Sequence, residues 1–180
     1  MSSATLSNER NSVATSRGGK YLTFALGKEE YGLEILKVRE IIGYMEITAV
    51  PRTPACVKGV INLRGQVISV VDLRAKFDMP AAQRTDETCV IVVEIEGENG
   101  RKLSTGIVVD RVSEVLNIAG DKIEEPPAFG AAVDTGFILG MGKIGQSVKI
   151  LLDIDKVLTA QEVVQLAEVS DEAQENVGPA

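Results

Sequence analysis

Two features of this 180-residue chain have the residue types and spacing of a chemical site: a glycine-rich segment and a pair of aspartates. The segment Gly140–Gly145 matches the G-x-G-x-x-G spacing of dinucleotide sites, which requires a strand before it and a helix after it. The residues that follow, Gln146–Leu151, are strand-like, so we interpret the segment as a hairpin turn. Asp153 and Asp155 would lie on the same side of an extended segment. We expect them to cap a turn or a helix, because no base or metal-ligand cluster accompanies them.

The absence of histidine limits the chemistry further. It excludes Ser-His-Asp and Cys-His pairs, a histidine general base and any zinc site that needs imidazole. Cys56 and Cys89 are too far apart for a CxxC metal or redox site, and we expect both thiols to be buried rather than reactive. A hydrolase that uses Asp72, Asp153 and Asp155 is the catalytic alternative. We expect no catalytic residue, no metal site and no cofactor.

The charge balance argues against polyanions as partners. The chain has 19 Lys and Arg residues and 26 Asp and Glu residues, which gives a net charge of −7. An acidic chain without a basic block is a poor candidate for binding nucleic acid or an anionic lipid surface. The sequence also lacks an apolar run long enough to span a membrane and an N-terminal signal peptide. We therefore expect a cytoplasmic protein that does not insert into a membrane.

The two ends of the chain differ in composition from its middle. Residues 1–19 are rich in Ser, Thr, Asn and Gly, and we expect them to form a flexible N-terminal tail. Residues 168–180 are predicted to form a flexible acidic C-terminal tail, and residues 20–167 to form the folded domain between the tails. A capping box at Thr159–Glu162 precedes an apolar run and predicts one short C-terminal helix.

Short β-branched runs between Gly, Asp or Asn residues predict a mostly β fold. Pro54–Lys58 and Leu73–Phe77 are the candidates for single helical turns. Close spacing of short strands with glycine-rich turns is typical of small barrels or a sandwich. The expected strands are Tyr21–Leu26, Tyr31–Ile35, Val67–Val71, Cys89–Ile95, Gly106–Val109 and Val148–Leu152.

An internal repeat relates the two halves of the chain. Gly32–Ile42 aligns without a gap with Gly106–Leu116, with Gly, Val and Glu at matching positions. Ile68–Leu73 likewise resembles Lys149–Ile154. Chance similarity among valine-rich strands is the alternative to two copies of one small barrel of about five strands. Because each half alone is close to the size at which a core becomes marginal, we expect the halves to share hydrophobic surface.

The segment Asn62–Gln66 joins two apolar runs and has the composition of a tight hairpin. Arg64 lies in it within a strongly apolar neighbourhood, where an arginine usually pairs with a carboxylate, and Glu40 is a plausible partner. A solvated arginine at a turn is the alternative. If the pair is buried, the substitution Arg64→Ala should lower stability as well as binding.

Apolar and charged residues alternate in Lys37–Ile41, which leaves two interpretations open. Val38, Ile41, Ile42 and Val67 are candidate core residues. Alternatively, some of them line an apolar groove between two barrels, rimmed with charge, which could accept a partner helix.

Five segments carry a resemblance to a known family: Glu30–Ile41, Thr53–Gly65, Val70–Arg74, Gly106–Asp110 and Glu125–Pro127. Over residues 20–166 the sequence resembles the CheW family, the coupling proteins of bacterial chemotaxis arrays. The resemblance implies an all-β fold of two intertwined five-stranded SH3-like barrels that share a hydrophobic core, with a short C-terminal helix. It also implies a non-catalytic adaptor between the cytoplasmic tips of chemoreceptors (methyl-accepting chemotaxis proteins) and the regulatory domain of the histidine kinase CheA, in cytoplasmic arrays at the membrane. A CheW-like module of another two-component signalling assembly is the alternative.

The resemblance also implies roles for individual residues of this chain. Glu40 and Arg64 correspond to a structural ion pair of the family. Cys56, Cys89 and Ile42 depart from its usual residues, which affects the detailed preferences of the groove. The residues implied in kinase binding are Glu46, Ile47, Lys58 and Gly59 on loops of the first barrel, and Phe129 in a second-barrel contact used in building rings. The residues implied in or near the receptor groove are Val38, Ile41, Val67, Cys89, Val90, Val112 and Val115.

Overall fold

Strands dominate the computed structural model, which describes residues 17–96, 100, 102–127 and 136–157. The mostly β prediction is confirmed. The helical elements are the 3-10 turns η1 (Ile35–Lys37) and η2 (Gly120–Lys122) and the helices α2 (Leu73–Lys76) and α3 (Ile154–Val157). The strands are β1 (Gly19–Leu26), β2 (Glu29–Glu34), β3 (Val38–Gly43), β4 (Val57–Leu63), β5 (Gln66–Asp72), β6 (Cys89–Glu96), β7 (Lys102–Val109), β8 (Arg111–Ile118), β9 (Ile123–Glu124), β10 (Ile138–Ile144) and β11 (Ser147–Leu152).

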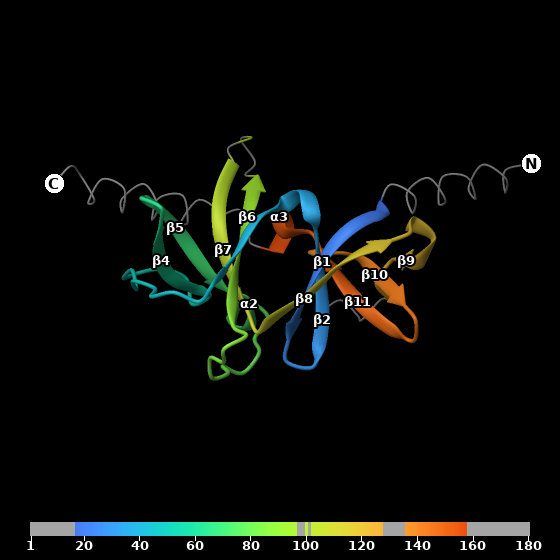
Figure 1. Ribbon diagram of the computed structural model, residues 1–180, viewed down its shortest axis with the longest axis horizontal. Helices are drawn as coiled ribbons and strands as arrows, with labels where there is room; N and C mark the ends of the chain where they lie inside the picture. Colours follow the sequence, from blue (N-terminus) through green and yellow to red (C-terminus); the bar gives the residue numbers. More distant parts are fainter. Residues whose placement is uncertain (1–16, 97–99, 101, 128–135, 158–180) are drawn as a thin grey trace, which may run out of the picture. The chain divides into compact units, whose positions relative to one another are not determined.

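The described residues divide into two compact units. Unit 1 is formed by residues up to Ile35 together with Ser113–Val157, and unit 2 by Leu36–Val112. One sheet has the strand order β8-β1-β2-β11-β10-β9, and the other has the order β3-β6-β7-β5-β4 (Figure 1). Because the chain enters unit 2 after Ile35 and returns to unit 1 after Val112, each sheet contains strands from both halves of the sequence.

The sheet registers give the internal repeat a structural basis. Strand β2 pairs in parallel with β11, and β7 pairs in parallel with β5. The pairs β1–β2, β10–β11, β9–β10, β3–β6, β4–β5 and β6–β7 are antiparallel. Gly32 lies opposite Leu151 across the first parallel pair, and Gly106 lies opposite Val70 across the second. These four residues occupy matching positions of the repeat, so the repeat is confirmed. The two halves are not separate barrels, however, because they exchange strands.

Close packing explains the glycine at this position of both copies. A Cβ atom on Gly32 would lie 2.7 Å from Cδ2 of Leu151. A Cβ atom on Gly106 would lie 2.7 Å from Cγ1 of Val90. Real Cβ atoms do not approach this closely, so any larger residue must displace a core side chain.

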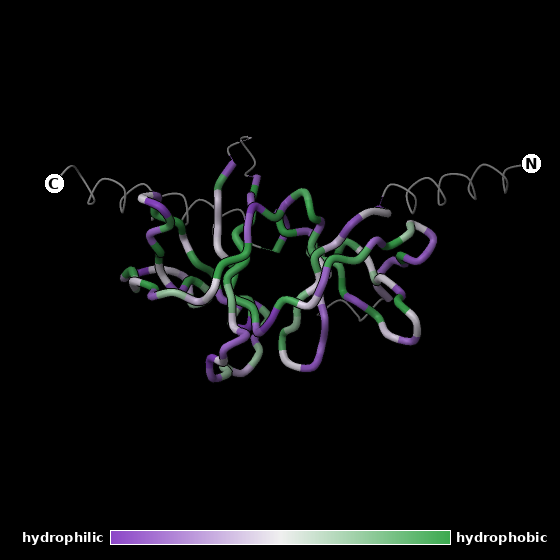
Figure 2. Tube along the Cα trace, viewed as in Figure 1, coloured by the Kyte–Doolittle hydropathy of each residue, from purple (hydrophilic) through white to green (hydrophobic). Residues whose placement is uncertain are grey.

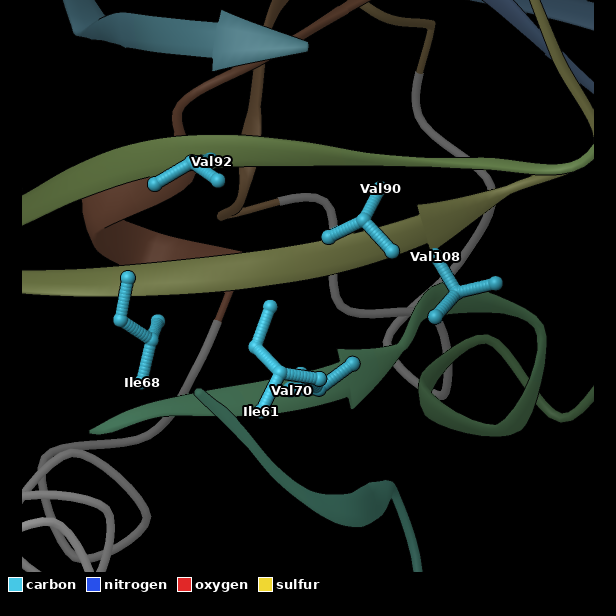
Figure 3. Packing of buried hydrophobic residues seen from close by; sticks show 6 residues of the cluster. All are labelled: Ile61, Ile68, Val70, Val90, Val92 and Val108. Carbon is cyan, nitrogen blue, oxygen red and sulfur yellow. The ribbon is translucent and has the colours of Figure 1, made fainter. Parts of the chain in front are cut away.

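Each unit has its own cluster of buried apolar side chains, and each cluster draws on both halves of the chain. Figure 2 shows hydrophobic residues along the strands and hydrophilic residues at the β1–β2 and β10–β11 turns. Because each cluster contains residues from both halves of the chain, the expectation that the halves share hydrophobic surface is confirmed. The unit 1 cluster contains Tyr21, Ile118, Ile123 and Leu151. The unit 2 cluster, whose side chains converge in Figure 3, contains Ile61, Ile68, Val70, Val90, Val92 and Val108.

The glycine-rich segment Gly140–Gly145 forms a hairpin, as expected. Ile144 pairs with Ser147, which leaves a two-residue loop that begins at Gly145. The φ of Gly145 is 59°, which suits a glycine at the first position of such a loop. The segment is therefore followed by strand β11 rather than by the helix that a dinucleotide site needs.

The expected helical turns have different outcomes. Leu73–Phe77 is confirmed, because α2 covers most of it. Pro54–Lys58 is confirmed only in part. The amide of Val57 donates to the carbonyl of Pro54 at 2.9 Å and closes one turn, but no helix forms, and Val57 begins β4 opposite Val71. A β-branched residue next to a strand partner favours the sheet. The helix expected after Thr159 and most of both expected tails lie outside the described residues.

Candidate partner-binding surfaces

A bulge in edge strand β3 places two of the candidate receptor residues on one face of the sheet. Val38 lies opposite Val93 and Ile41 lies opposite Ile91, with a register shift between Val38 and Glu40. Without the bulge, residues three positions apart would point to opposite faces. Val38 is half-buried, and the Ile41 side chain is 45% exposed, so this face of β3 presents apolar atoms to solvent.

Strand β8 presents the matching residues of the second repeat copy. Val112 aligns with Val38, and Val115 aligns with Ile41. Val112 is half-buried and Val115 is 50% exposed, close to the values of the first copy. Like β3, β8 is a terminal strand of its sheet in the described residues. Four of the seven candidate receptor residues therefore lie on equivalent edge strands and remain partly accessible.

Two of the other three candidate receptor residues are buried. Val90 is fully buried in the unit 2 cluster (Figure 3), and Val67 is 8% exposed. These two side chains pack the core, so they can affect a partner only through the strands that they support. Cys89 is half-buried, and burial raises the pKa of its thiol above the ordinary value, although a hydrogen bond with the Val112 backbone lowers it. Cys56 is buried, as expected, whereas the same expectation for Cys89 is met only in part.

The candidate kinase residues surround the contact between strand β4 and the segment that precedes it. Thr48 and Val60 exchange two backbone hydrogen bonds of 2.9 Å, which hold this segment against β4. A Cβ on Gly59 would lie 2.0 Å from the Thr48 carbonyl oxygen, and the φ of Gly59 is 145°. Gly59 is thus required by the backbone and is itself buried.

The other residues of this set have different accessibility. The side chains of Glu46 and Lys58 are exposed, whereas Ile47 is half-buried against the unit 2 cluster. The surface therefore offers one acidic group, one basic group and an apolar edge. Phe129 lies outside the described residues.

Glu40 and Arg64 form the expected ion pair, but the pair is not buried. Two guanidinium nitrogens of Arg64 donate to the two carboxylate oxygens of Glu40, at 3.0 and 2.7 Å. The side chains are 28% exposed for Glu40 and 73% exposed for Arg64. Hydrogen bonding to Glu40 raises the pKa of Arg64 above its ordinary value. The two interpretations of Arg64 are therefore both correct, since it is a paired arginine and also a solvated one at a turn.

The turn itself has an unusual residue at its first position. Leu63 pairs with Gln66, and the loop residues Arg64 and Gly65 have φ values of 52° and 85°. This is the geometry of a type I′ turn, which favours Asn-Gly. Asn62 has a different role, because its side-chain oxygen accepts a hydrogen bond from the amide of Gly65 at 2.8 Å.

A second bidentate pair, Arg74–Asp110, was not predicted. The Nε atom of Arg74 donates to Asp110 at 2.8 Å, and a further guanidinium nitrogen donates to the carbonyl of Pro80 at 2.8 Å. The pair has side-chain exposures of 16% and 31%, lower than those of the Glu40–Arg64 pair. Hydrogen bonding to Asp110 raises the pKa of Arg74. In the sequence, Arg74 and Asp110 each come at the end of an apolar run. The parallel pairing of β5 with β7 brings the two residues together.

The aspartates considered for catalysis have structural roles. The side chain of Asp72 accepts a hydrogen bond from the amide of Arg74 at 3.0 Å and so caps α2. The side chain of Asp153 accepts one from the amide of Asp155 at 3.2 Å at the start of α3. This confirms the expected capping role. Within the described residues, no cluster of three or more acidic or cysteine side chains is arranged to hold a metal ion. No helix in the same residues is long and apolar enough to cross a membrane.

Comparisons with known proteins give a consistent family assignment. A family model described as "CheW-like domain" matches residues 20–162. The chain is 40% identical to "Chemotaxis protein CheW" of Klebsiella aerogenes over 153 residues, which covers 85% of this chain and 89% of that protein. It is 31% identical to "Chemotaxis protein CheW" of Treponema pallidum, with coverage of 81% and 85%.

A solved structure is also similar to this chain. It is described as the crystal structure of the scaffolding protein TtCheW from Thermoanaerobacter tengcongensis. The TM-score is 0.70 at 33% sequence identity, and the match covers 81% of this chain and 97% of that one. The fold and the sequence motifs therefore point to the same family.

Proposed function

The chain belongs to the CheW family, and we propose that it is a non-catalytic chemotaxis adaptor that couples the cytoplasmic tips of chemoreceptors to the regulatory domain of the histidine kinase CheA. The family assignment supports the coarser role of a scaffolding protein in chemotaxis. The absence of histidine and the capping roles of the aspartates agree with a protein that binds rather than catalyses. In this proposal the protein acts in the cytoplasm, at receptor arrays on the membrane.

The matching exposure of the two edge strands is the observation that carries the receptor part of the proposal. Ile41 and Val115 occupy equivalent repeat positions and are 45% and 50% exposed. Partly exposed apolar side chains beside charged ones suit the apolar face of an amphipathic partner helix. The receptor-binding role of Val38, Ile41, Val112 and Val115 rests on this exposure and on the family resemblance.

The kinase part of the proposal rests on the surface around Lys58. Glu46 and Lys58 offer opposite charges, and Ile47 adds an apolar edge. The Thr48–Val60 hydrogen bonds and Gly59 fix the backbone that carries these residues. A pre-organised loop loses little conformational freedom on binding, which favours a stable contact.

Separate binding measurements test the two parts. We expect Ile41→Glu to weaken co-sedimentation with receptor cytoplasmic fragments by at least about tenfold, because it places a charge in an apolar contact. Its affinity for the kinase regulatory domain should stay within about twofold of the wild type. Val38→Asp should show the same selectivity.

Val148→Asp is the matched control, because Val148 is 49% exposed on β11 and belongs to neither proposed surface. It should bind both partners normally. Wild-type protein that binds neither receptor nor kinase would contradict the proposed function. Equal loss of both partners in Ile41→Glu and Val38→Asp would contradict the assignment of the receptor surface.

A further inference from the structure

Two cationic side chains from different parts of unit 2 contact the aromatic ring of Tyr44. The Nζ atom of Lys58, on β4, lies 5.8 Å from the ring centroid. The Cζ atom of Arg84, in the loop between α2 and β6, lies 4.5 Å from it. Both distances lie within the range of cation–π contacts. We call these three residues the Tyr44 cluster.

The two cations of the Tyr44 cluster have no carboxylate partner in the part of the chain that the structure describes. Seven of the described basic side chains in other places form ion pairs with acidic ones, among them Arg64, Arg74 and Lys149. Lys58 and Arg84 are exposed, and their contacts are with the ring. Two positive charges thus converge on one ring of a protein whose net charge is −7.

Several hydrogen bonds order the loop that presents Arg84. Arg74, which is held by Asp110, donates to the carbonyl of Pro80 near the start of the loop. After Arg84, the amide of Thr85 donates to the Thr88 hydroxyl at 2.9 Å. The guanidinium is therefore carried by a structured loop. The neighbouring acidic residues Asp86 and Glu87 form no ion pair with it in the described residues.

We propose that the Tyr44 cluster binds a carboxylate side chain of the kinase regulatory domain and so extends the kinase-facing surface to Arg84. This inference rests on the proposed function, and it is continuous with the proposed kinase surface because Lys58 belongs to both. The contacts with the ring hold the charged groups of Lys58 and Arg84 near Tyr44, and both side chains remain exposed to an anionic partner. The occupant is an acidic segment of the kinase, because neither charge has a carboxylate partner among the described residues.

Charge reversal at Arg84 tests the inference. We expect Arg84→Glu to weaken binding of the CheA regulatory domain about tenfold and Arg84→Ala about threefold, as measured by titration calorimetry. The affinity of the wild type should also fall more steeply with added salt than that of Arg84→Ala. Tyr44→Phe should bind like the wild type because it keeps the ring, whereas Tyr44→Leu should bind more weakly.

Lys122→Glu is the matched control, because Lys122 is an exposed cation of η2 in unit 1. It should bind the kinase domain within about twofold of the wild type, since it makes the same change in net charge at a residue that belongs to neither the Tyr44 cluster nor the proposed kinase surface. An Arg84→Glu affinity equal to that of the wild type would overturn this inference and leave the proposed function intact. An equal loss in Lys122→Glu would also overturn it, because it would show that net charge alone governs binding. Absence of wild-type binding would instead contradict the proposed function.

Discussion

The two copies of the repeat share their backbone packing and differ in their ion pairs. Gly32 and Gly106 each lie too close to a core side chain to carry a Cβ atom, and Asp72 and Asp153 each cap the start of a helix. The Arg74–Asp110 ion pair is not repeated in the other copy, because the position that aligns with Asp110 is Leu36, which is 92% exposed. The aligned glycines and caps thus define the fold, while the unshared polar residues give each copy a different surface.

The largest expected effect tests the shared packing. Gly32→Val and Gly106→Val should each lower the free energy of unfolding by about 2–4 kcal/mol, because the added side chain meets a core atom in both sheets. Denaturant titration measures this. Gly43→Val, at a β3 position where a Cβ meets nothing within 4 Å, should change stability by less than about 0.5 kcal/mol. A large effect in one repeat copy alone would break the structural equivalence.

The next largest effect is expected at the Arg74–Asp110 ion pair, which has no equivalent at the aligned position Leu36. Arg74→Ala removes a bidentate pair whose guanidinium is 16% exposed, and we expect a loss of about 1–2 kcal/mol. Leu36→Ala, at the position that aligns with Asp110, should leave the unfolding free energy within about 0.5 kcal/mol of the wild type. Equal effects at the two positions would show that the Arg74–Asp110 pair does not distinguish them.

A pH effect should be specific to the unit 1 core. Burial, reinforced by Glu34, raises the pKa of Tyr21 from 10.0 to about 12. The folded state therefore holds this proton more tightly than the unfolded state, so the stabilisation is complete below pH 10 and is lost as the pH rises toward 12. We expect unfolding free energy to fall by about 1 kcal/mol between pH 10 and 11.

The variant Tyr21→Phe should reduce this slope. Tyr31, whose pKa is also raised by burial, should leave a smaller residual slope in that variant. An identical slope in the wild type and in Tyr21→Phe would assign the pH dependence to other groups.

The smallest expected effect concerns the exposed pair of unit 2. Because Arg64 is 73% exposed, Arg64→Ala should shift the melting temperature by less than about 2 °C. This revises the expectation of a strong loss, which depended on a buried pair. A shift larger than that of Arg74→Ala in thermal unfolding would reverse the ranking of the two pairs.

The fold was more predictable from the sequence than the accessibility of the site. Period-two runs and turn glycines are local signals, and the repeat is visible when the two halves of the sequence are compared. The two sheets confirm all three. The burial of Val90 could not be inferred, because β-branched residues look alike on an open and a covered face of a strand. The common face of Val38 and Ile41 depends on a bulge that no residue type signals. The Arg74–Asp110 pair depends on the exchange of strands between the halves.

Receptor control of the kinase is the most direct test of the adaptor role. Phosphorylation of CheA would be measured with receptor-containing membranes, with and without the wild-type chain, and with Ile41→Glu and Arg84→Glu in its place. The account predicts receptor-dependent phosphorylation only when the wild-type chain is present, and a reduced response with each variant. Receptor control that is equally strong without the chain, or no control with it, would contradict the account.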